Sequence, residues 1–133
     1  MIEKLDQFAR ELVEKTHAKK LNWRRMTDLD SDVEGFTVDL DQNFSFQLRS
    51  VVGVGPNHNS DTYHTIALQL WKDHLPMRES VVRNWQSTNT SENMQEMATR
   101  FRLYSDLLDV VREGVYDSEG TFVKVEELLR KIS

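Results

Sequence analysis

The sequence predicts an α+β protein: an antiparallel sheet of three to four strands, with an N-terminal helix and a long C-terminal helix packed on one face. Three observations support this prediction. Apolar and polar residues alternate between 36 and 71, apolar residues recur at helical spacing towards both ends, and turn-forming residues separate the alternating runs. The 133 residues fit a single domain, 1–133.

The first expected element is an amphipathic helix from Ile2 to about residue 19. Its apolar residues are three and four positions apart, with charged residues between them, so one face must pack on a partner surface. Leu21 and Trp23 follow. We expect a loop here that tucks both side chains under the end of the helix.

Three strands are predicted next, at 36–40, 44–54 and 63–71, with a short turn at 41–43. Ser50 interrupts the apolar face of the second strand. The opposite face of the sheet should be more polar, and we expect any working surface to lie along it. Its predicted members are Thr37, Asp39, Ser45, Gln47, Thr65, Gln69 and Trp71.

The segment 73–87 allows two interpretations. A helix could start at Pro76, because Met77, Val81 and Trp85 would then stack at intervals of four. A fourth strand at 80–85 would instead place Val81 and Trp85 on one face with Arg83.

The C-terminal part is predicted to form two helices. The longer runs from 92 to 113, and Gly114 is expected to end it as a C-terminal cap. Its apolar stripe is expected to contribute to the core. The stripe consists of Met94, Met97, Phe101, Tyr104, Leu108 and Val111. A short helix from 124 to 132 should then bury Val125, Leu128, Leu129 and Ile132.

Composition points to a cytoplasmic protein. There is no cysteine, which excludes disulfides and cysteine-based zinc sites. The first residues are charged and no apolar run approaches the length of a membrane span, so we expect neither a signal peptide nor a membrane partner. No motif for a cofactor is present, and we expect none.

Charge is concentrated in one segment. The net charge is −5, yet six acids and no base lie between 28 and 41. Residues 27–35 are expected to form an exposed acidic loop. Its alternating aspartates resemble the start of a calcium-binding EF-hand loop, but Val33 replaces the turn glycine and Asp39 the bidentate glutamate. We therefore predict no metal site.

Two further groups of residues suggest other functions. His58, Asp61 and His64 lie close in sequence and could serve a small enzyme or bind a metal, although no recognised catalytic pattern accompanies them. A basic cluster around Trp23 could contact nucleic acid, with the indole stacking on a base. Its members are Lys15, Lys19, Lys20, Arg24 and Arg25. The adjacent acidic run and the negative net charge argue against nucleic acid as the partner.

The layout also resembles a loose set of small, uncharacterised bacterial α+β proteins of the immunity or antitoxin type. The residues that carry the resemblance are the Leu21-x-Trp23 anchor, Leu103-Tyr104, Leu107-Leu108 and Glu126 to Leu129. They are packing residues, so the resemblance implies a protein partner but assigns no site residue.

The leading hypothesis is a non-enzymatic, intracellular protein-binding module. It would present an acidic surface to a partner with a basic surface, such as a nucleic-acid-cleaving toxin. We predict no catalytic residue. The predicted partner-binding residues are Asp28, Asp30, Asp32, Glu34, Asp39 and Trp71.

Overall fold

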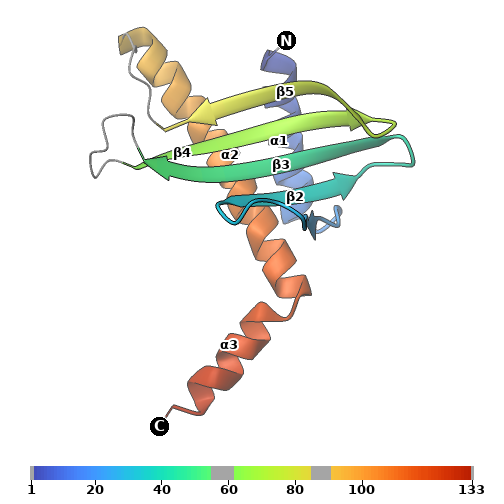
Figure 1. Cartoon of the computed structure of the whole chain (residues 1–133), viewed down its shortest axis with the longest axis vertical. Helices are drawn as coiled ribbons and strands as arrows, with labels where there is room; N and C mark the ends of the chain where they lie inside the picture. Colours follow the sequence, from blue (N-terminus) through green and yellow to red (C-terminus); the bar gives the residue numbers. More distant parts are fainter. Residues whose placement is uncertain (1, 55–61, 85–90, 133) are drawn as a thin grey trace.

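The computed structural model describes residues 2–54, 62–84 and 91–132 as a five-stranded antiparallel sheet and three helices (Figure 1). In chain order the elements are α1 (Ile2–His17), β1 (Arg24–Arg25), β2 (Val33–Asp39), β3 (Phe44–Val54), β4 (Thr62–Lys72), β5 (Leu75–Arg83), α2 (Ser91–Ser118) and α3 (Thr121–Arg130). The α+β class and the antiparallel sheet are thus confirmed, while the strand number of three to four was too low.

The strands form a meander in which β1 to β5 lie side by side in chain order. The predicted turn at 41–43 is confirmed, because the Asp41 carboxylate accepts the backbone N–H groups of Phe44 and Asn43, at 2.7 and 2.8 Å. These bonds hold the pKa of Asp41 below its usual value. A second tight turn joins β4 to β5 through Asp73 and His74, both at positive φ.

Both α1 and α2 lie on one face of the sheet, behind the strands in Figure 1, and the core fills the space between. Every second residue of a strand points to the helices, and these positions supply the part of the core that comes from the sheet. The buried sheet residues are Phe36, Val38, Phe46, Leu48, Ile66, Leu68 and Val82. The helices contribute Leu5, Ala9, Leu12, Tyr104, Leu107, Leu108, Val111 and Val115.

A buried polar network ties both helices to β5. The Arg100 guanidinium donates to the Asp6 carboxylate at 2.9 Å and to the Ser80 hydroxyl at 2.7 Å. The Tyr104 hydroxyl donates to the same carboxylate at 2.7 Å, and burial raises the pKa of Tyr104 to about 12. Asp6 is only 8% exposed, so its carboxylate takes hydrogen bonds from these partners in place of water.

The segment 73–87 resolves as a strand as far as Arg83, which excludes the helix at Pro76. The described strand starts at Leu75, earlier than the predicted 80–85, and Trp85 lies outside the described residues. The acidic loop is also shorter than expected, because β2 already begins at Val33.

The long helix does not end at Gly114 but continues to Ser118. Val111 and Val115 are both buried, one on each side of the glycine, so core packing carries the helix past it. At its other end Met94 is 55% exposed and does not belong to the core as predicted.

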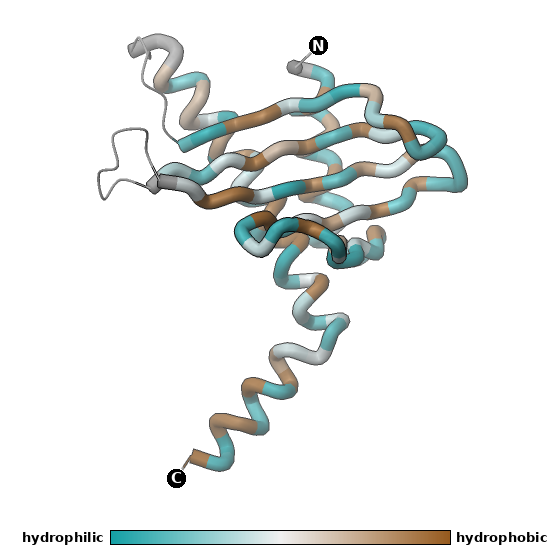
Figure 2. The backbone as a smooth tube through the Cα atoms, in the orientation of Figure 1, coloured by the Kyte–Doolittle hydropathy of each residue, from teal (hydrophilic) through white to brown (hydrophobic). Residues whose placement is uncertain are grey.

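The expectation that the last helix packs into the core is wrong. No residue of α3 is buried, and α3 extends away from the sheet and from α1 (Figure 1). Its hydrophobic and hydrophilic residues alternate along the backbone in Figure 2. The four residues predicted to be buried, Val125, Leu128, Leu129 and Ile132, are between 46% and 74% exposed.

Candidate functional site

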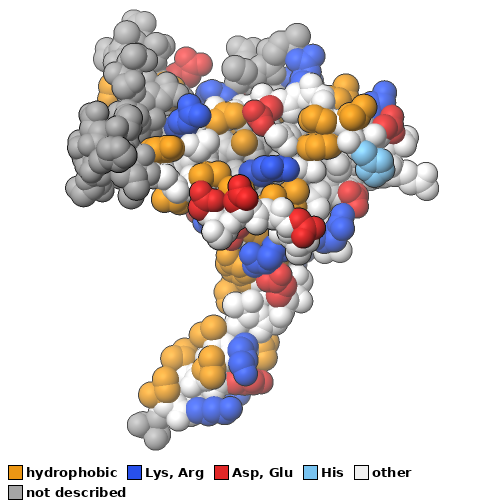
Figure 3. Space-filling model, viewed as in Figure 1, with side chains coloured by type: hydrophobic (Ala, Val, Ile, Leu, Met, Phe, Trp, Pro, Cys, Tyr) orange, Lys and Arg blue, Asp and Glu red, His pale blue; other side chains and the backbone are white. Residues whose placement is uncertain are grey.

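The face of the sheet turned away from the helices, which we call the open face, is covered only in part. The strand register aligns its side chains in rows across β2, β3 and β4. One row is Asp39, Ser45 and Trp71, and the next is Thr37, Gln47 and Gln69. The sequence prediction of this mixed polar face is therefore confirmed, and Figure 3 shows acidic, basic and apolar side chains mingled over it.

Trp71 lies half-buried on the open face within a chain of hydrogen bonds. Its indole N–H donates to the Gln69 side-chain oxygen at 3.0 Å, and the Gln69 amide in turn donates to Glu79. The hydrogen bond satisfies the indole N–H, while part of the ring surface remains accessible.

The loop between β1 and β2 folds over one edge of the open face. A Cβ added at Gly35 would lie 2.6 Å from Cδ1 of Leu29 and 3.2 Å from Sδ of Met26. Glycine at 35 thus lets these two apolar side chains sit directly on β2. The loop (residues 26–32) is closed by backbone bonds from Met26 to Gly35 and from Val33 to Asp30.

Three aspartates of this loop, Asp28, Asp30 and Asp32, are exposed, and no ion pair within the described residues involves them. We call them the aspartate triplet. Asp28 adopts a φ of 61°, a left-handed conformation that aspartate tolerates. Within the described part of the chain no group of three or more His, Asp or Glu residues could hold a metal ion.

The other two acids predicted to bind a partner are engaged within the chain. The Glu34 carboxylate accepts from Arg112 Nε at 2.6 Å and from the Tyr116 hydroxyl at 3.0 Å. Asp39 pairs with Arg24 at 2.8 Å on the surface. The charges of Glu34 and Asp39 are therefore balanced within the chain, whereas those of the aspartate triplet are not balanced by an ion pair in the described residues.

Arg25 joins the start of the sheet to the end of α2. It donates two hydrogen bonds to the Glu119 carboxylate, at 3.0 and 3.1 Å, and its guanidinium lies 5.2 Å from the centre of the Tyr116 ring. The hydrogen bonds to Arg25 hold the pKa of Glu119 below its usual value. Of the predicted basic cluster, Arg24 and Arg25 are thus paired within the chain.

Trp23 is 5% exposed, and its indole N–H donates to the Thr16 hydroxyl at 2.9 Å. This confirms that the loop after α1 packs under the end of the helix. A buried indole cannot stack on a nucleic-acid base, so the structure offers no support for that part of the nucleic-acid hypothesis.

His64 pairs with a residue that the sequence pattern did not single out as functional. Its Nε2 lies 2.6 Å from the Ser50 hydroxyl, and its ring meets Phe101 edge-on at 5.7 Å between centroids. Burial lowers the pKa of His64, helped by the positive charge of Arg112. Serine next to a neutral histidine is the arrangement of a nucleophile and its base. However, Ser50 is only 3% exposed, which keeps substrate atoms away from its oxygen.

His58 and Asp61, the other members of the predicted histidine group, lie outside the described residues. No sequence signal pointed to the partners that the fold gives Glu34, because Arg112 lies 78 positions further on. The alternation in β3 and β4 did place Ser50 and His64 on the same face as the apolar core residues of their strands, and this was the sequence signal that the two side chains could meet.

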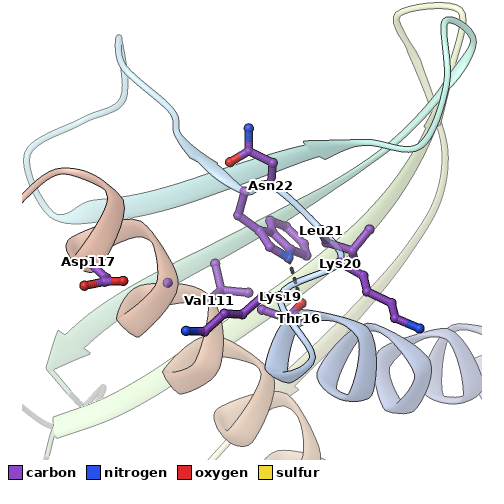
Figure 4. A pocket seen from close by; sticks show the side chains of 9 residues that line it. Thr16, Lys19, Lys20, Leu21, Asn22, Val111 and Asp117 are labelled. Carbon is purple, nitrogen blue, oxygen red and sulfur yellow. Dashed lines mark hydrogen bonds between the residues drawn. The ribbon is translucent and has the colours of Figure 1, made fainter.

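Two hollows lie where the ends of α1 and α2 meet. The first measures about 350 Å³, and Figure 4 shows Lys19, Lys20 and Asn22 around it. Thr16 and Trp23, which are joined by a hydrogen bond, also line it. The second measures about 300 Å³ and is lined by residues that include Val110, Glu113, Asp117 and Phe122. Gly114 lines both, and a Cβ added there would meet no atom within 4 Å.

Searches of family models, curated proteins and solved structures found no match to this chain. None of the helices in the described residues is long and apolar enough to cross a membrane. The function is therefore argued from the surfaces alone.

Proposed function

We propose that this chain is a non-enzymatic protein-binding module that docks a partner with a basic surface. The docking surface consists of the aspartate triplet together with the adjacent open face and Trp71. The proposed partner is a protein rather than a nucleic acid, because the triplet would repel phosphates.

The observation that carries this proposal is the contrast among the acids of the segment 28–39. Glu34 and Asp39 are neutralised by arginines of the same chain, whereas the triplet is exposed without an ion pair in the described residues. Carboxylates that no internal cation neutralises attract a cationic partner over roughly a Debye length, about 8 to 10 Å at ordinary salt.

The position of the triplet also supports a docking role. Met26 and Leu29 hold the loop against β2, so the three carboxylates lie beside the exposed part of the open face rather than on a loop that projects freely. Trp71 lies on the same face, in register with Ser45 and Asp39 at the end of the strands opposite the loop. An interface commonly combines charged side chains that steer the partner with a half-buried aromatic side chain that anchors it. The triplet would then steer the partner, and Trp71 would anchor it.

Resemblance to proteins of the immunity or antitoxin type suggests the class of partner. A nucleic-acid-cleaving enzyme carries a basic surface to hold its own substrate. An acidic module could cover that surface, and association would be fast at low salt. This identification of the partner is part of the proposal.

The experiment compares three forms of the chain as baits in native cell extract. They are the wild type, D28N/D30N/D32N, and the control E14Q/E96Q/D106N, which removes the same charge from exposed positions on α1 and α2. We expect one protein to be captured by the wild type and the control and lost by the triplet variant. The purified pair should associate more slowly as salt is raised, with a flatter salt dependence for the triplet variant. Equal association rates for both triple variants at low salt would refute the proposal.

A further inference from the structure

We propose that the chain pairs with a second copy of itself through α3, the two helices lying antiparallel. The C-terminal end of each α3 then rests at the hollow beside Gly114 of the other copy. This inference uses none of the residues of the proposed partner-binding surface and stands independently of it.

One side of α3 carries an exposed apolar stripe. Phe122, Val125, Leu128, Leu129 and Ile132 recur at spacings of three and four and therefore share one side of the helix. Their exposed fractions are 41%, 46%, 48%, 62% and 74%. Contiguous apolar surface of this kind marks an interaction site, and Figure 3 shows apolar side chains along α3, away from the sheet.

The charges near α3 favour a second copy as its partner, arranged antiparallel. Glu113 and Asp117 are exposed just before α3, and neither has an ion pair in the described residues. Lys131 is exposed at the other end, next to Arg130, whose contact with Glu126 at 3.9 Å is also exposed. Parallel helices would place lysine beside lysine. Antiparallel helices place Lys131 of each copy towards Asp117 of the other.

The shape of the surface agrees with the antiparallel arrangement. In an antiparallel pair, Ile132 of one copy approaches Phe122 of the other, and Phe122 lines the hollow of about 300 Å³ that also includes Gly114 and Asp117. A Cβ at Gly114 would project into open space, with no atom within 4 Å, so a larger side chain there would take up part of the hollow. Glycine in a helix interior is less stable than alanine by up to about 1 kcal/mol, so its presence at 114 is consistent with a need for open space there.

The apolar area available suits a weak, reversible dimer. Covering the exposed parts of five apolar side chains from each copy, together with the hollow, removes on the order of 1,000 Å² from water, near the lower limit of a specific interface. Because the pairing is two-fold symmetric, every favourable contact occurs twice.

The test is the molar mass of the full chain as a function of concentration, by sedimentation equilibrium. We expect a reversible dimer for the wild type and a monomer for L129E. V123E is the matched control, because Val123 is 57% exposed but points to the other side of α3. It should dimerise as the wild type does. Far-ultraviolet circular dichroism of each variant separates loss of pairing from loss of folding.

Two charge-reversal variants test the arrangement. D117K and K131D should each raise the dimer dissociation constant at least about tenfold, which corresponds to roughly 1.4 kcal/mol. An equimolar mixture of the two should pair more tightly than either variant alone, because each contact then joins opposite charges. G114L, which fills the hollow, should also weaken pairing.

Three results would overturn the proposal. One is a wild type that stays monomeric at every accessible concentration. This result would also overturn the proposal if α3 proved to bind a different protein. Another is equal behaviour of V123E and L129E. The third is a mixture of the charge-reversal variants that pairs no better than its components.

Discussion

The hydroxyl oxygen of Ser50 lies 2.6 Å from Nε2 of His64 on the helix-covered face of the sheet. The pair is packed against Phe101 of α2, and Arg112 lies near enough to act on the imidazole electrostatically. The fold therefore favours a neutral His64. Glu34 and Asp109 oppose this effect, but burial is the larger cause.

This environment predicts acid sensitivity from one histidine. The pKa of His64 is lower in the folded state than its ordinary value of 6.5, so the unfolded chain binds the proton first as pH falls. The stabilisation is complete above pH 6.5 and is lost as pH falls from there through the folded-state pKa. Urea unfolding between about pH 7.5 and pH 5 should show a steeper loss for the wild type than for H64F, which keeps an aromatic ring and removes the titration. Parallel curves would contradict the prediction.

The Asp6 network predicts a large effect of a single truncation. R100A leaves the Asp6 carboxylate buried without its cation and should lower the free energy of unfolding by about 3 kcal/mol. R102A is the matched control, because Arg102 is exposed on the same helix, and it should change the value by less than about 0.5 kcal/mol. Urea denaturation near neutral pH measures both. A loss in R100A no larger than in R102A would mean that Asp6 is solvated without its partner.

The double variant D6L/R100M sharpens this prediction. It replaces both charges with apolar groups and should recover part of the lost stability, because no charge is left stranded, although the Tyr104 hydroxyl loses its carboxylate acceptor. Failure to recover would show that the geometry of the pair contributes beyond its charge balance.

The sheet could be predicted where each strand has one buried face. Phe36 and Val38, like Ile66 and Leu68, are buried, while the residues between them are not, so the alternation in the sequence reports the structure directly. The pattern fails in β5, because Ser80 and Val82 point to the core while Val81 is exposed. Because the polar Ser80 lies on the buried face and the apolar Val81 on the exposed face, the hydrophobic pattern of the sequence indicates the wrong face as buried. The turn through Asp73 and His74 also lacks the glycine that usually marks it.

The last helix shows a different limit. Periodicity indicates that one side of α3 is apolar, but it does not say which surface covers that side. Val125 and Leu128 have the spacing of core residues, yet no described residue of the domain buries them. Gly114 misled for a related reason: glycine often ends a helix, but buried Val115 keeps this one continuous. Local pattern is decisive only where tertiary contacts agree with it.

The candidate site was predictable in part. The exposed aspartates follow from a run of acids without periodicity, and the mixed open face follows from alternation. The engagement of Glu34 does not, since it needs the placement of α2 over the start of β2. The sequence also could not show that Trp23 is buried rather than exposed, because its burial depends on how the loop after α1 packs against Thr16.

The contact between Trp23 and Thr16 predicts a measurable coupling. T16V removes the acceptor but keeps the shape, so a buried indole N–H is left without a partner, at a cost of about 1–3 kcal/mol. W23F removes the donor together with part of a large buried side chain. In the double variant the T16V change should cost much less, because no N–H remains to be satisfied. Urea unfolding of the four proteins gives the coupling free energy, and additive losses would contradict the hydrogen bond.

A matched pair of leucines tests how the two C-terminal helices differ. Leu107 in α2 is 0% exposed and Leu129 in α3 is 62% exposed, and the change to alanine is chemically the same. L107A should lower the free energy of unfolding by about 2–5 kcal/mol, because it opens a cavity in the core. At concentrations low enough for a monomer, L129A should change it by less than about 0.5 kcal/mol. As concentration rises, the wild type should become more stable and L129A should not, since only the dimer uses that side chain. Thermal unfolding over a range of concentrations measures both effects. A large loss in L129A at the lowest concentration would place Leu129 in the core of the single chain, contrary to the exposure seen here.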